Sequence, residues 1–264
     1  MKLCVKNLQI TALGENRELV KGIDFSVSQG ESVILLGQSG SGKTMTCRAV
    51  MGLLDPKKFS VKGKILSDDR DLLTMPLRER LGIYGGDIAF IPQNPMTALD
   101  PSVRIGRQMD ETLALHGKAS KAERKARILE SLTQAGLPDG AEIYSAYPHM
   151  LSGGMLQRVL IAMTMMGQAK IVIADEPTTA LDVIHRNETI DSFIRLRQNG
   201  TGIFMVTHDF SAAVQLGGRV MIMKEGNILE RGQVKEVLSA PKADYTKALI
   251  SASSLSRTRT GGLS

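Results

Sequence analysis

The sequence has 264 residues, a length that corresponds to between one and two domains of typical size. Hydrophobic residues make up 42% and charged residues 23%, as in ordinary globular proteins, and no apolar run reaches the ~18–20 residues that span a bilayer. The net charge is only +6, and the basic residues form short clusters such as 118–127, which also contains Glu123, so we expect no nucleic acid partner.

The first strands in chain order are expected at 3–11 and 22–27, where alternating apolar and polar residues predict a half-exposed antiparallel pair. The continuous apolar run at 32–36 predicts a strand buried on both faces. A glycine-rich segment at 37–44 and a helix as far as residue 51 follow this strand. Residues 56–70 are polar and predict a connector or a short strand, and 87–92 predict a further strand.

The spacing of apolar residues becomes helical from about 94 to 168, which predicts a helical insertion. Apolar strands at 171–174 and 202–206 and a hairpin at 220–230 follow, and the Ser-, Thr- and Gly-rich residues 251–264 predict a flexible tail. The pattern predicts an α/β fold with a central, mainly parallel sheet, an N-terminal antiparallel β subdomain and an inserted α-helical subdomain. We expect a single domain over 1–250, with a nucleotide-binding core of 1–93 and 169–250 and a helical subdomain of 94–168.

The cysteines and the first residues bear on the compartment. Cys4 and Cys47 are too few for a disulfide framework, and the histidines have no zinc-site spacing. Residues 1–7 become polar too soon for a secretory signal. A reduced, cytosolic setting is therefore expected.

A phosphate-binding loop is predicted between the buried strand and the helix that follows it. The segment fits the pattern G-x-x-x-x-G-K-[S/T], whose glycines let backbone N–H groups surround phosphate oxygens at a helix N-terminus. We expect Lys43 to reach the β- and γ-phosphates and Thr44 to coordinate Mg²⁺. The predicted phosphate-binding residues are Gly37, Gln38, Ser39, Gly40, Ser41, Gly42, Lys43 and Thr44.

Polar side chains that follow other buried strands complete the predicted catalytic site. Asp175 and Glu176 end the strand at 171–174, so we expect Asp175 to hold Mg²⁺ and Glu176 to orient a water in line with the γ-phosphate. His208 follows the strand at 202–206 and is expected to donate a hydrogen bond to the γ-phosphate and fix the water. Gln93 follows a further strand and is suited to bind Mg²⁺ or the attacking water at a hinge.

The segment at 151–158, LSGGMLQR, resembles the signature of the ATP-binding cassette (ABC) ATPases. Other motifs of that family occur in its order: the phosphate loop, Gln93, Asp175-Glu176, Ala180-Leu181-Asp182 and His208. The resemblance covers about 1–250 and implies a P-loop NTPase fold of the ABC type that binds ATP and Mg²⁺.

The resemblance also implies a head-to-tail pair of ATPase subunits, in which each ATP lies between the phosphate loop of one subunit and the signature of the other. Ser-Gly-Gly at the start of a helix is a second anion site, with a hydroxyl and exposed N–H groups. Asp182 is expected to cross the subunit interface. The signature residues expected at the partner's ATP are Ser152, Gly153, Gly154 and Gln157.

Residues 93–101, 147–158, 174–182 and 241–249 are similar to the peptide/nickel importer branch of the family. The chain ends at Ser264 without a cysteine-rich stretch, and Met155-Leu156 follow the signature glycines, which favours the nickel importers. An oligopeptide, dipeptide or other metal-chelate importer is the alternative. The branch implies a sister ABC ATPase as a heterodimer partner, two transmembrane permease subunits and an extracellular or periplasmic substrate-binding protein. The chain would then lie at the cytoplasmic face of the cell membrane, as a peripheral subunit.

The sequence departs from the family near Ala12, where members commonly carry an aromatic residue that stacks on adenine. We expect adenine to pack on Val20 instead, with weaker ATP affinity and looser base choice. Two rival classes of protein fit the sequence less well. A cassette that acts on ribosomes would carry a second cassette in the same chain, and one that acts on DNA would carry a long coiled coil before Ser152. A binding module without hydrolysis conflicts with the presence of Glu176 and His208.

Overall fold

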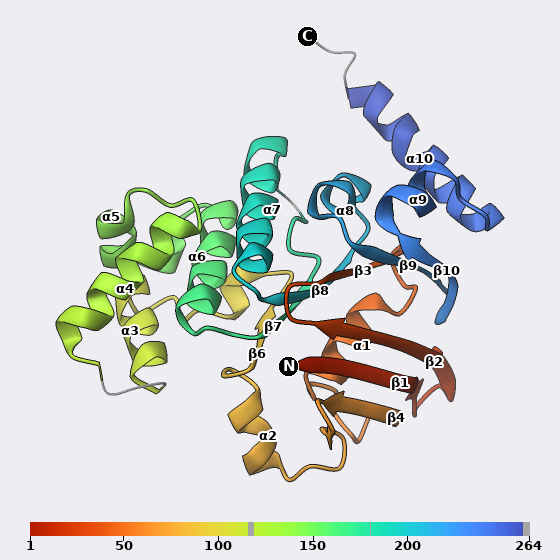
Figure 1. The fold of residues 1–264 in the computed structure, drawn as a ribbon, viewed down its shortest axis with the longest axis horizontal. Helices are drawn as coiled ribbons and strands as arrows, with labels where there is room; N and C mark the ends of the chain where they lie inside the picture. The colour runs from red at the N-terminus through yellow and green to blue at the C-terminus, as the bar shows by residue number, and fades with distance from the viewer. Residues whose placement is uncertain (116–118, 180, 261–264) are drawn as a thin grey trace.

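The computed structural model describes residues 1–115, 119–179 and 181–260. Within these residues, the strands form an antiparallel sheet and a second, mainly parallel sheet, with helices packed around the second one (Figure 1). No helix in the described residues is both long and apolar enough to cross a membrane.

The antiparallel sheet has the strand order β2-β1-β4-β5. The expected pair is confirmed, because β1 and β2 pair antiparallel from Lys2↔Ser28 to Ala12↔Arg17. The polar segment predicted as a connector or short strand is instead a long strand, β4, which hydrogen-bonds along β1. Pairing with its neighbours outweighed its polar composition, since a strand of an antiparallel sheet can expose one face to water. The strands are β1 (Lys2–Ala12), β2 (Arg17–Ser28), β4 (Phe59–Ser67) and β5 (Arg70–Asp71).

The second sheet has the strand order β10-β9-β3-β8-β7-β6 and carries the predicted buried strands at its centre. Strands β3, β8, β7 and β6 run parallel, and β9 also runs parallel to β3. The predicted hairpin is formed by β9 and β10. Strands β3, β7 and β8 are buried along their whole length, as their continuous apolar sequences indicated. The strands are β3 (Ser32–Leu36), β6 (Ile88–Ile91), β7 (Ile171–Asp175), β8 (Gly202–Thr207), β9 (Arg219–Lys224) and β10 (Asn227–Gln233).

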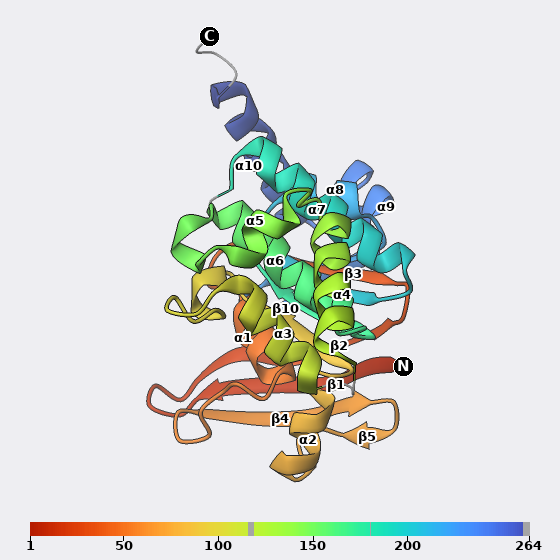
Figure 2. The same ribbon diagram turned by 90° about the vertical axis from the view of Figure 1, so that its left-hand side faces the viewer.

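The helices of the region 94–168 form a group beside β6 and β7 (Figures 1 and 2). They bury a core of their own, which includes Met109, Ile128 and Val159. Helix α4 begins with a capping box, in which Ser120 and Glu123 each accept a hydrogen bond from the other's backbone N–H. The group comprises η1 (Pro95–Thr97), α3 (Ile105–Leu115), α4 (Lys121–Gln134), α5 (Gly140–Ser145), η2 (Pro148–Met150) and α6 (Gly153–Met166).

The other helices lie around the sheets. Helix α2 was not predicted, because it is too short to show a clear helical pattern of apolar residues. Ile83 is the residue that it buries. Helix α10 continues to residue 260, so the backbone at 251–260, expected to belong to a flexible tail, is helical. These helices are α1 (Lys43–Val50), α2 (Leu77–Ile83), α7 (Val183–Gln198), α8 (Phe210–Leu216), α9 (Val234–Ser239) and α10 (Asp244–Thr260).

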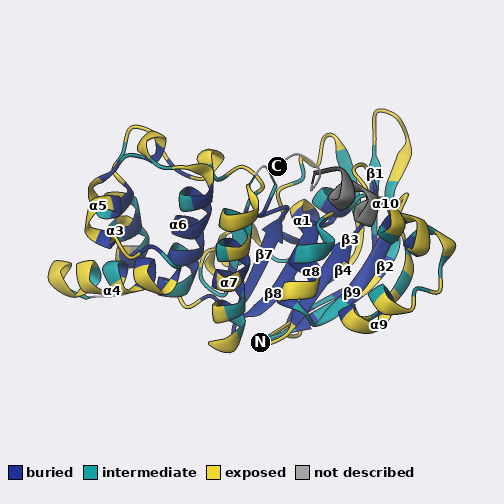
Figure 3. Ribbon diagram, turned by 90° about the horizontal axis from the view of Figure 1, so that it is seen from above, coloured by how far each residue is buried: buried dark blue, intermediate teal, exposed yellow. Residues whose placement is uncertain are grey.

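The two sheets share a core that fixes the base of the phosphate loop. Figure 3 shows dark blue, buried residues along β3, β7 and β8 in the middle of the molecule. Phe25 of β2 stacks on Phe204 of β8, with ring centroids 4.4 Å apart. This contact attaches the antiparallel sheet directly to the central sheet.

Replacing Phe204 by Ala should cost about 3–5 kcal/mol of unfolding free energy, because the fully buried ring leaves a cavity between the sheets. Replacing Leu229, whose side chain is 45% exposed on β10, is the matched control and should change the stability by less than about 0.5 kcal/mol. Urea denaturation of both variants measures the difference. Equal losses would contradict the assignment of this ring to the shared core.

Candidate functional site

The phosphate loop lies between β3 and α1, and its backbone requires glycine. Gly40 and Gly42 have φ angles of 79° and 110°, which other residues rarely adopt. A Cβ atom on Gly42 would also lie 2.6 Å from the carbonyl oxygen of Leu19. The chain can therefore turn here and begin α1 at Lys43. The first N–H groups of this helix have no partner within the helix and are available to a ligand at the loop.

Lys43 lies against the inside of this loop. Its Nζ donates hydrogen bonds to the carbonyl oxygens of Gly37 at 2.7 Å and Gln38 at 3.0 Å. It also lies 3.4 Å from Oε1 of Glu176, with both side chains more than nine-tenths buried. The ammonium group is thus fixed between the loop and the end of β7, where it can neutralise an anion held by the loop.

Asp175 and Thr44 form the second part of the site. The Thr44 hydroxyl donates to Oδ1 of Asp175 at 3.0 Å. Burial raises the pKa of the Asp175 carboxyl above its ordinary value, an effect that the Thr44 hydrogen bond partly offsets. A hydroxyl and one carboxylate fit Mg²⁺, which prefers oxygen ligands and keeps several waters.

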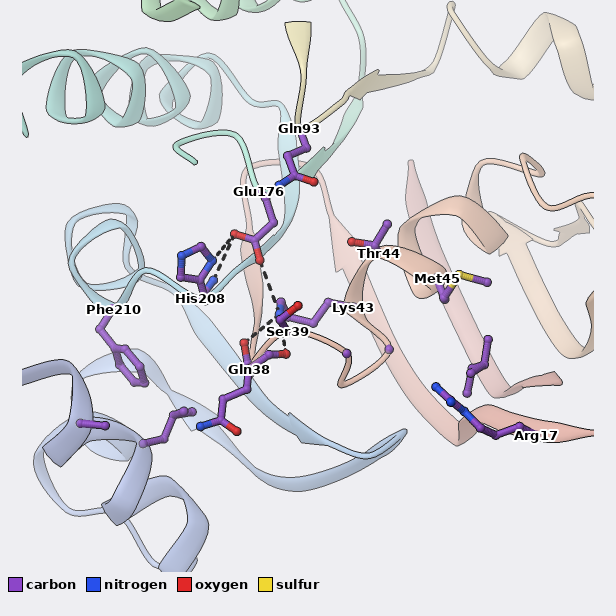
Figure 4. A pocket seen from close by; sticks show the side chains of 16 residues that line it. Arg17, Gln38, Ser39, Lys43, Thr44, Met45, Gln93, Glu176, His208 and Phe210 are labelled. Carbon is purple, nitrogen blue, oxygen red and sulfur yellow. Dashed lines mark hydrogen bonds and ion pairs between the residues drawn. The ribbon is translucent and has the colours of Figure 1, made fainter. Parts of the chain in front are cut away.

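Glu176 has an unusual backbone that directs its side chain into the site. Its φ angle is 48°, in the left-handed region, and its N–H donates to the carbonyl oxygen of Val206 at 2.9 Å. Oε2 lies 2.7 Å from Nδ1 of His208 (Figure 4). It also accepts a hydrogen bond from the Thr179 hydroxyl at 3.3 Å. Such strain is maintained where the surroundings over-determine a functional residue. Here the surroundings orient one carboxylate between Lys43 and His208.

These groups line a cavity of about 650 Å³, a volume typical of small-molecule sites. Gln93, after β6, reaches the same cavity. Ser41 is buried within the loop and Asp175 lies behind Thr44, so neither lines it. The predicted residues that do line it are Gly37, Gln38, Ser39, Gly40, Gly42, Lys43, Thr44, Gln93, Glu176 and His208.

The prediction for Val20 is wrong. Val20 is fully buried in the core, and Leu19 and Arg17 line the cavity instead. The strand alternation explains the error, because successive residues of β2 face opposite sides of the sheet. In a regular strand, residues 19 and 21 would share the buried face of Ile23 and Phe25. The positive φ angle of Gly22 interrupts this alternation, and Val20 is buried instead.

Further residues line the cavity at both sides of the phosphate loop, and no motif in the sequence indicated them. Figure 4 shows Arg17 and Met45 on one side of Lys43 and Phe210 on the other. Leu249 of α10 joins Phe210, and the nearby Tyr245 hydroxyl accepts a hydrogen bond from the Gln38 N–H at 3.4 Å. Nothing in the sequence places α10 beside this loop, although Phe210 follows His208 closely enough to have been considered.

The signature residues do not line this cavity. Ser152 caps α6, and its Oγ accepts the Met155 N–H at 3.2 Å, while Gly153 is exposed. Asp182 caps α7 in the same way through the His185 N–H at 2.9 Å. Ala180, in the motif before α7, lies outside the described residues.

The expected role of Gln157 at a partner's ATP is contradicted. Its side chain is only 2% exposed, inside the molecule. The reason is that α6 is buried on all sides from Leu156 to Ala162, so no side of this part of the helix is exposed. At the start of α6, Ser152 and Gly153 are the exposed residues of the signature segment.

Comparison with known proteins gives consistent matches. The family model described as ABC transporter matches residues 20–179. The dipeptide transport ATP-binding protein DppD of Bacillus subtilis (strain 168) is 39% identical over 252 residues, 94% of this chain and 75% of that protein. The metal-staphylopine import system ATP-binding protein CntD of Staphylococcus aureus (strain Mu50) is 37% identical over 94% of this chain and 92% of that protein.

A solved structure extends the match to three dimensions. The dimeric, post-hydrolysis structure of the ATP-binding cassette MJ0796 bound to ADP and Pi has a TM-score of 0.77. It is 27% identical and the match covers 88% of this chain and 98% of that one.

Replacing Asp175 by Asn should raise the melting temperature at pH 7 in nucleotide-free buffer. Because the folded-state pKa is raised, the folded chain keeps a proton that the unfolded chain releases, and this stabilisation is lost as the pH rises through the folded-state pKa. The advantage of the Asn variant should therefore shrink as the pH falls towards about 4, the ordinary Asp range. Thermal unfolding across this pH range measures it, and an advantage that grows on acidification would contradict it.

Proposed function

The chain belongs to the ABC transporter family, whose ATPases couple ATP hydrolysis to transport, and we propose that this one drives the import of short peptides or metal chelates. The P-loop ATPase fold expected from the motifs is confirmed by the match to the MJ0796 cassette. The observation that carries the proposal is the Lys43–Glu176–His208 arrangement at the phosphate loop. The names of DppD and CntD supply the cargo class.

In this proposal the phosphates of ATP lie on the loop, with the γ-phosphate towards Glu176 and His208. Thr44, Asp175 and Gln93 would hold Mg²⁺, which supplies charge neutralisation between the β- and γ-phosphates. Glu176 accepts a proton from the attacking water, and Lys43 stabilises charge on the transferred phosphoryl group. The 2.7 Å contact from His208 Nδ1 keeps the Glu176 carboxylate oriented.

The nucleoside would then extend to the other side of the loop, away from Glu176. Leu19, Met45 and Arg17 line that side, so the base packs on aliphatic and cationic side chains rather than on an aromatic ring. Aromatic stacking contributes ~0.5–1.5 kcal/mol beyond area burial, so its absence supports weaker discrimination between ATP and GTP.

A second ATPase subunit would complete the site. Ser152, Gly153 and Asp182 are kept at the starts of α6 and α7, apart from the cavity of their own subunit, which suits them to a neighbour's nucleotide. We infer a sister ATPase, two transmembrane permease subunits and an external substrate-binding protein as partners, at the cytoplasmic face of the membrane. The dimeric MJ0796 cassette supports the pairing.

The cargo is proposed at the level of class. Similarity to DppD supports a dipeptide and similarity to CntD a metal chelate, whereas nickel itself was favoured by the sequence resemblance alone. The permease and the binding protein would select among these cargoes, because the site described here handles nucleotide.

Replacing Glu176 by Gln should lower ATP turnover at least ~10²-fold while ATP still binds, because the amide cannot accept the proton. Steady-state hydrolysis and equilibrium binding of labelled ATP measure the two effects. Lys43→Ala is the comparison variant and should lose binding as well. Undiminished turnover in Glu176→Gln would remove this carboxylate from its role.

Uptake of a labelled dipeptide, a labelled nickel–histidine chelate and nickel chloride by cells distinguishes the cargoes. Cells whose own copy carries Glu176→Gln should lose uptake of the dipeptide or the chelate, since the transporter no longer completes its cycle. Loss of uptake from nickel chloride alone would favour the narrower nickel interpretation. Unchanged uptake of all three would contradict the proposed cargo class.

A further inference from the structure

His185 lies where the first turns of α6 and α7 meet, next to residues that the catalytic cavity does not use. Its backbone N–H donates to Oδ1 of Asp182 at 2.9 Å, and its ring Nδ1 lies 2.6 Å from Oδ2. The Asp182 carboxylate is thus held through both oxygens. Because both side chains are partly exposed, these contacts add little to stability, and their effect is to orient the Asp182 carboxylate.

The same imidazole lies on the first turn of α6. A Cβ atom on Gly154 would be 3.0 Å from Cβ of His185 and 3.2 Å from its ring Cδ2. No side chain fits at Gly154 without displacing His185. One residue therefore touches the signature segment and the Asp182 carboxylate together.

The two helices are also joined further along. Nη1 of Arg158, on α6, lies 3.1 Å from Oε2 of Glu188 on α7 and donates to the Gly136 carbonyl oxygen at 2.9 Å. The Arg158 side chain is 7% exposed and that of Glu188 is 43% exposed, so this pair joins the packed part of the interface between the helices to its edge. His185 extends the connection to the helix starts.

We propose that His185 is a positioning residue that holds Asp182 and the start of α6 together, so that both reach the ATP of a second subunit as one unit. The proposal rests on the proposed function, because it needs a paired subunit. The physical basis is conformational entropy. Ordering the Asp182 segment and the start of α6 separately would make the free energy of subunit association less favourable, and a contact that already joins them lowers this entropic cost.

Variants at position 185 separate this role from general packing. His185→Ala removes the ring contacts with Oδ2 of Asp182 and with Gly154, while the backbone N–H that bonds Oδ1 and the Cβ atom of residue 185 remain. His185→Gln keeps a side-chain donor three residues after Asp182 and is the rescue variant. His149→Ala is the matched control, since His149 is exposed in the same helical region and contacts the Tyr147 ring instead.

Amide hydrogen exchange of the purified chain without nucleotide tests the contact itself. In His185→Ala, the backbone N–H groups of Leu156 and Arg186, which bond to the carbonyl oxygens of Ser152 and Asp182, should exchange about fivefold faster or more. Exchange at 37–44 should not change, and His185→Gln and His149→Ala should stay within about twofold of the unmodified protein. Unchanged exchange in His185→Ala would overturn the proposal.

Steady-state hydrolysis tests the consequence. In His185→Ala, kcat should fall about tenfold with the KM for ATP unchanged, because the phosphate loop of each subunit is intact. His185→Gln should recover most of kcat, and His149→Ala should match the unmodified chain. Faster exchange with an unchanged kcat would also overturn the positioning role. Hydrolysis is assayed with the sister ATPase subunit present. If this pair with the unmodified chain hydrolyses no ATP, the proposed function fails instead, and the exchange result still decides whether His185 joins the helices.

Discussion

Parallel pairing of β3, β8 and β7 brings the reacting groups of this protein to one edge of the sheet. The register places Leu36 beside Thr207 and Asp175 beside Val206, so these strands end at nearly the same level. The next residue of each strand carries chemistry, namely Gly37, His208 and Glu176. Ligands of open α/β sheets bind at this edge for the same reason.

The buried pair formed by Lys43 and Glu176 is the costly part of this arrangement. Removing two charges from water carries a penalty that a single contact does not recover. Here Lys43 also donates to two carbonyl oxygens, and Glu176 is held by His208 and Thr179. The positive φ angle of Glu176 shows that the backbone is adapted to this pair rather than to the preference of the residue. These contacts place a cation and an oriented carboxylate beside the phosphate loop.

The signature segment and Asp182 lie on separate elements, at the starts of α6 and α7. Ser152 and Asp182 cap these helices but line no part of the cavity at the phosphate loop. The helical group that carries Ser152 has its own core, and α7 connects it to the end of β7. The helical group thus packs on α7, which follows the Glu176 segment in the chain.

The sequence by itself determined the central strands, the phosphate loop and the polar residues after β7 and β8. Continuous apolar runs and the glycine spacing of the phosphate loop are local signals, so they can be recognised without knowing which segments pack against them. Tertiary structure alone decided the secondary structure of residues 56–70, because a polar strand forms there by pairing with β1. It also decided which side chains face the cavity, where Leu19 replaced the expected Val20 and α10 brought Leu249. Contacts such as that of His185 with Gly154 join residues distant in the chain, and no spacing in the sequence encodes them.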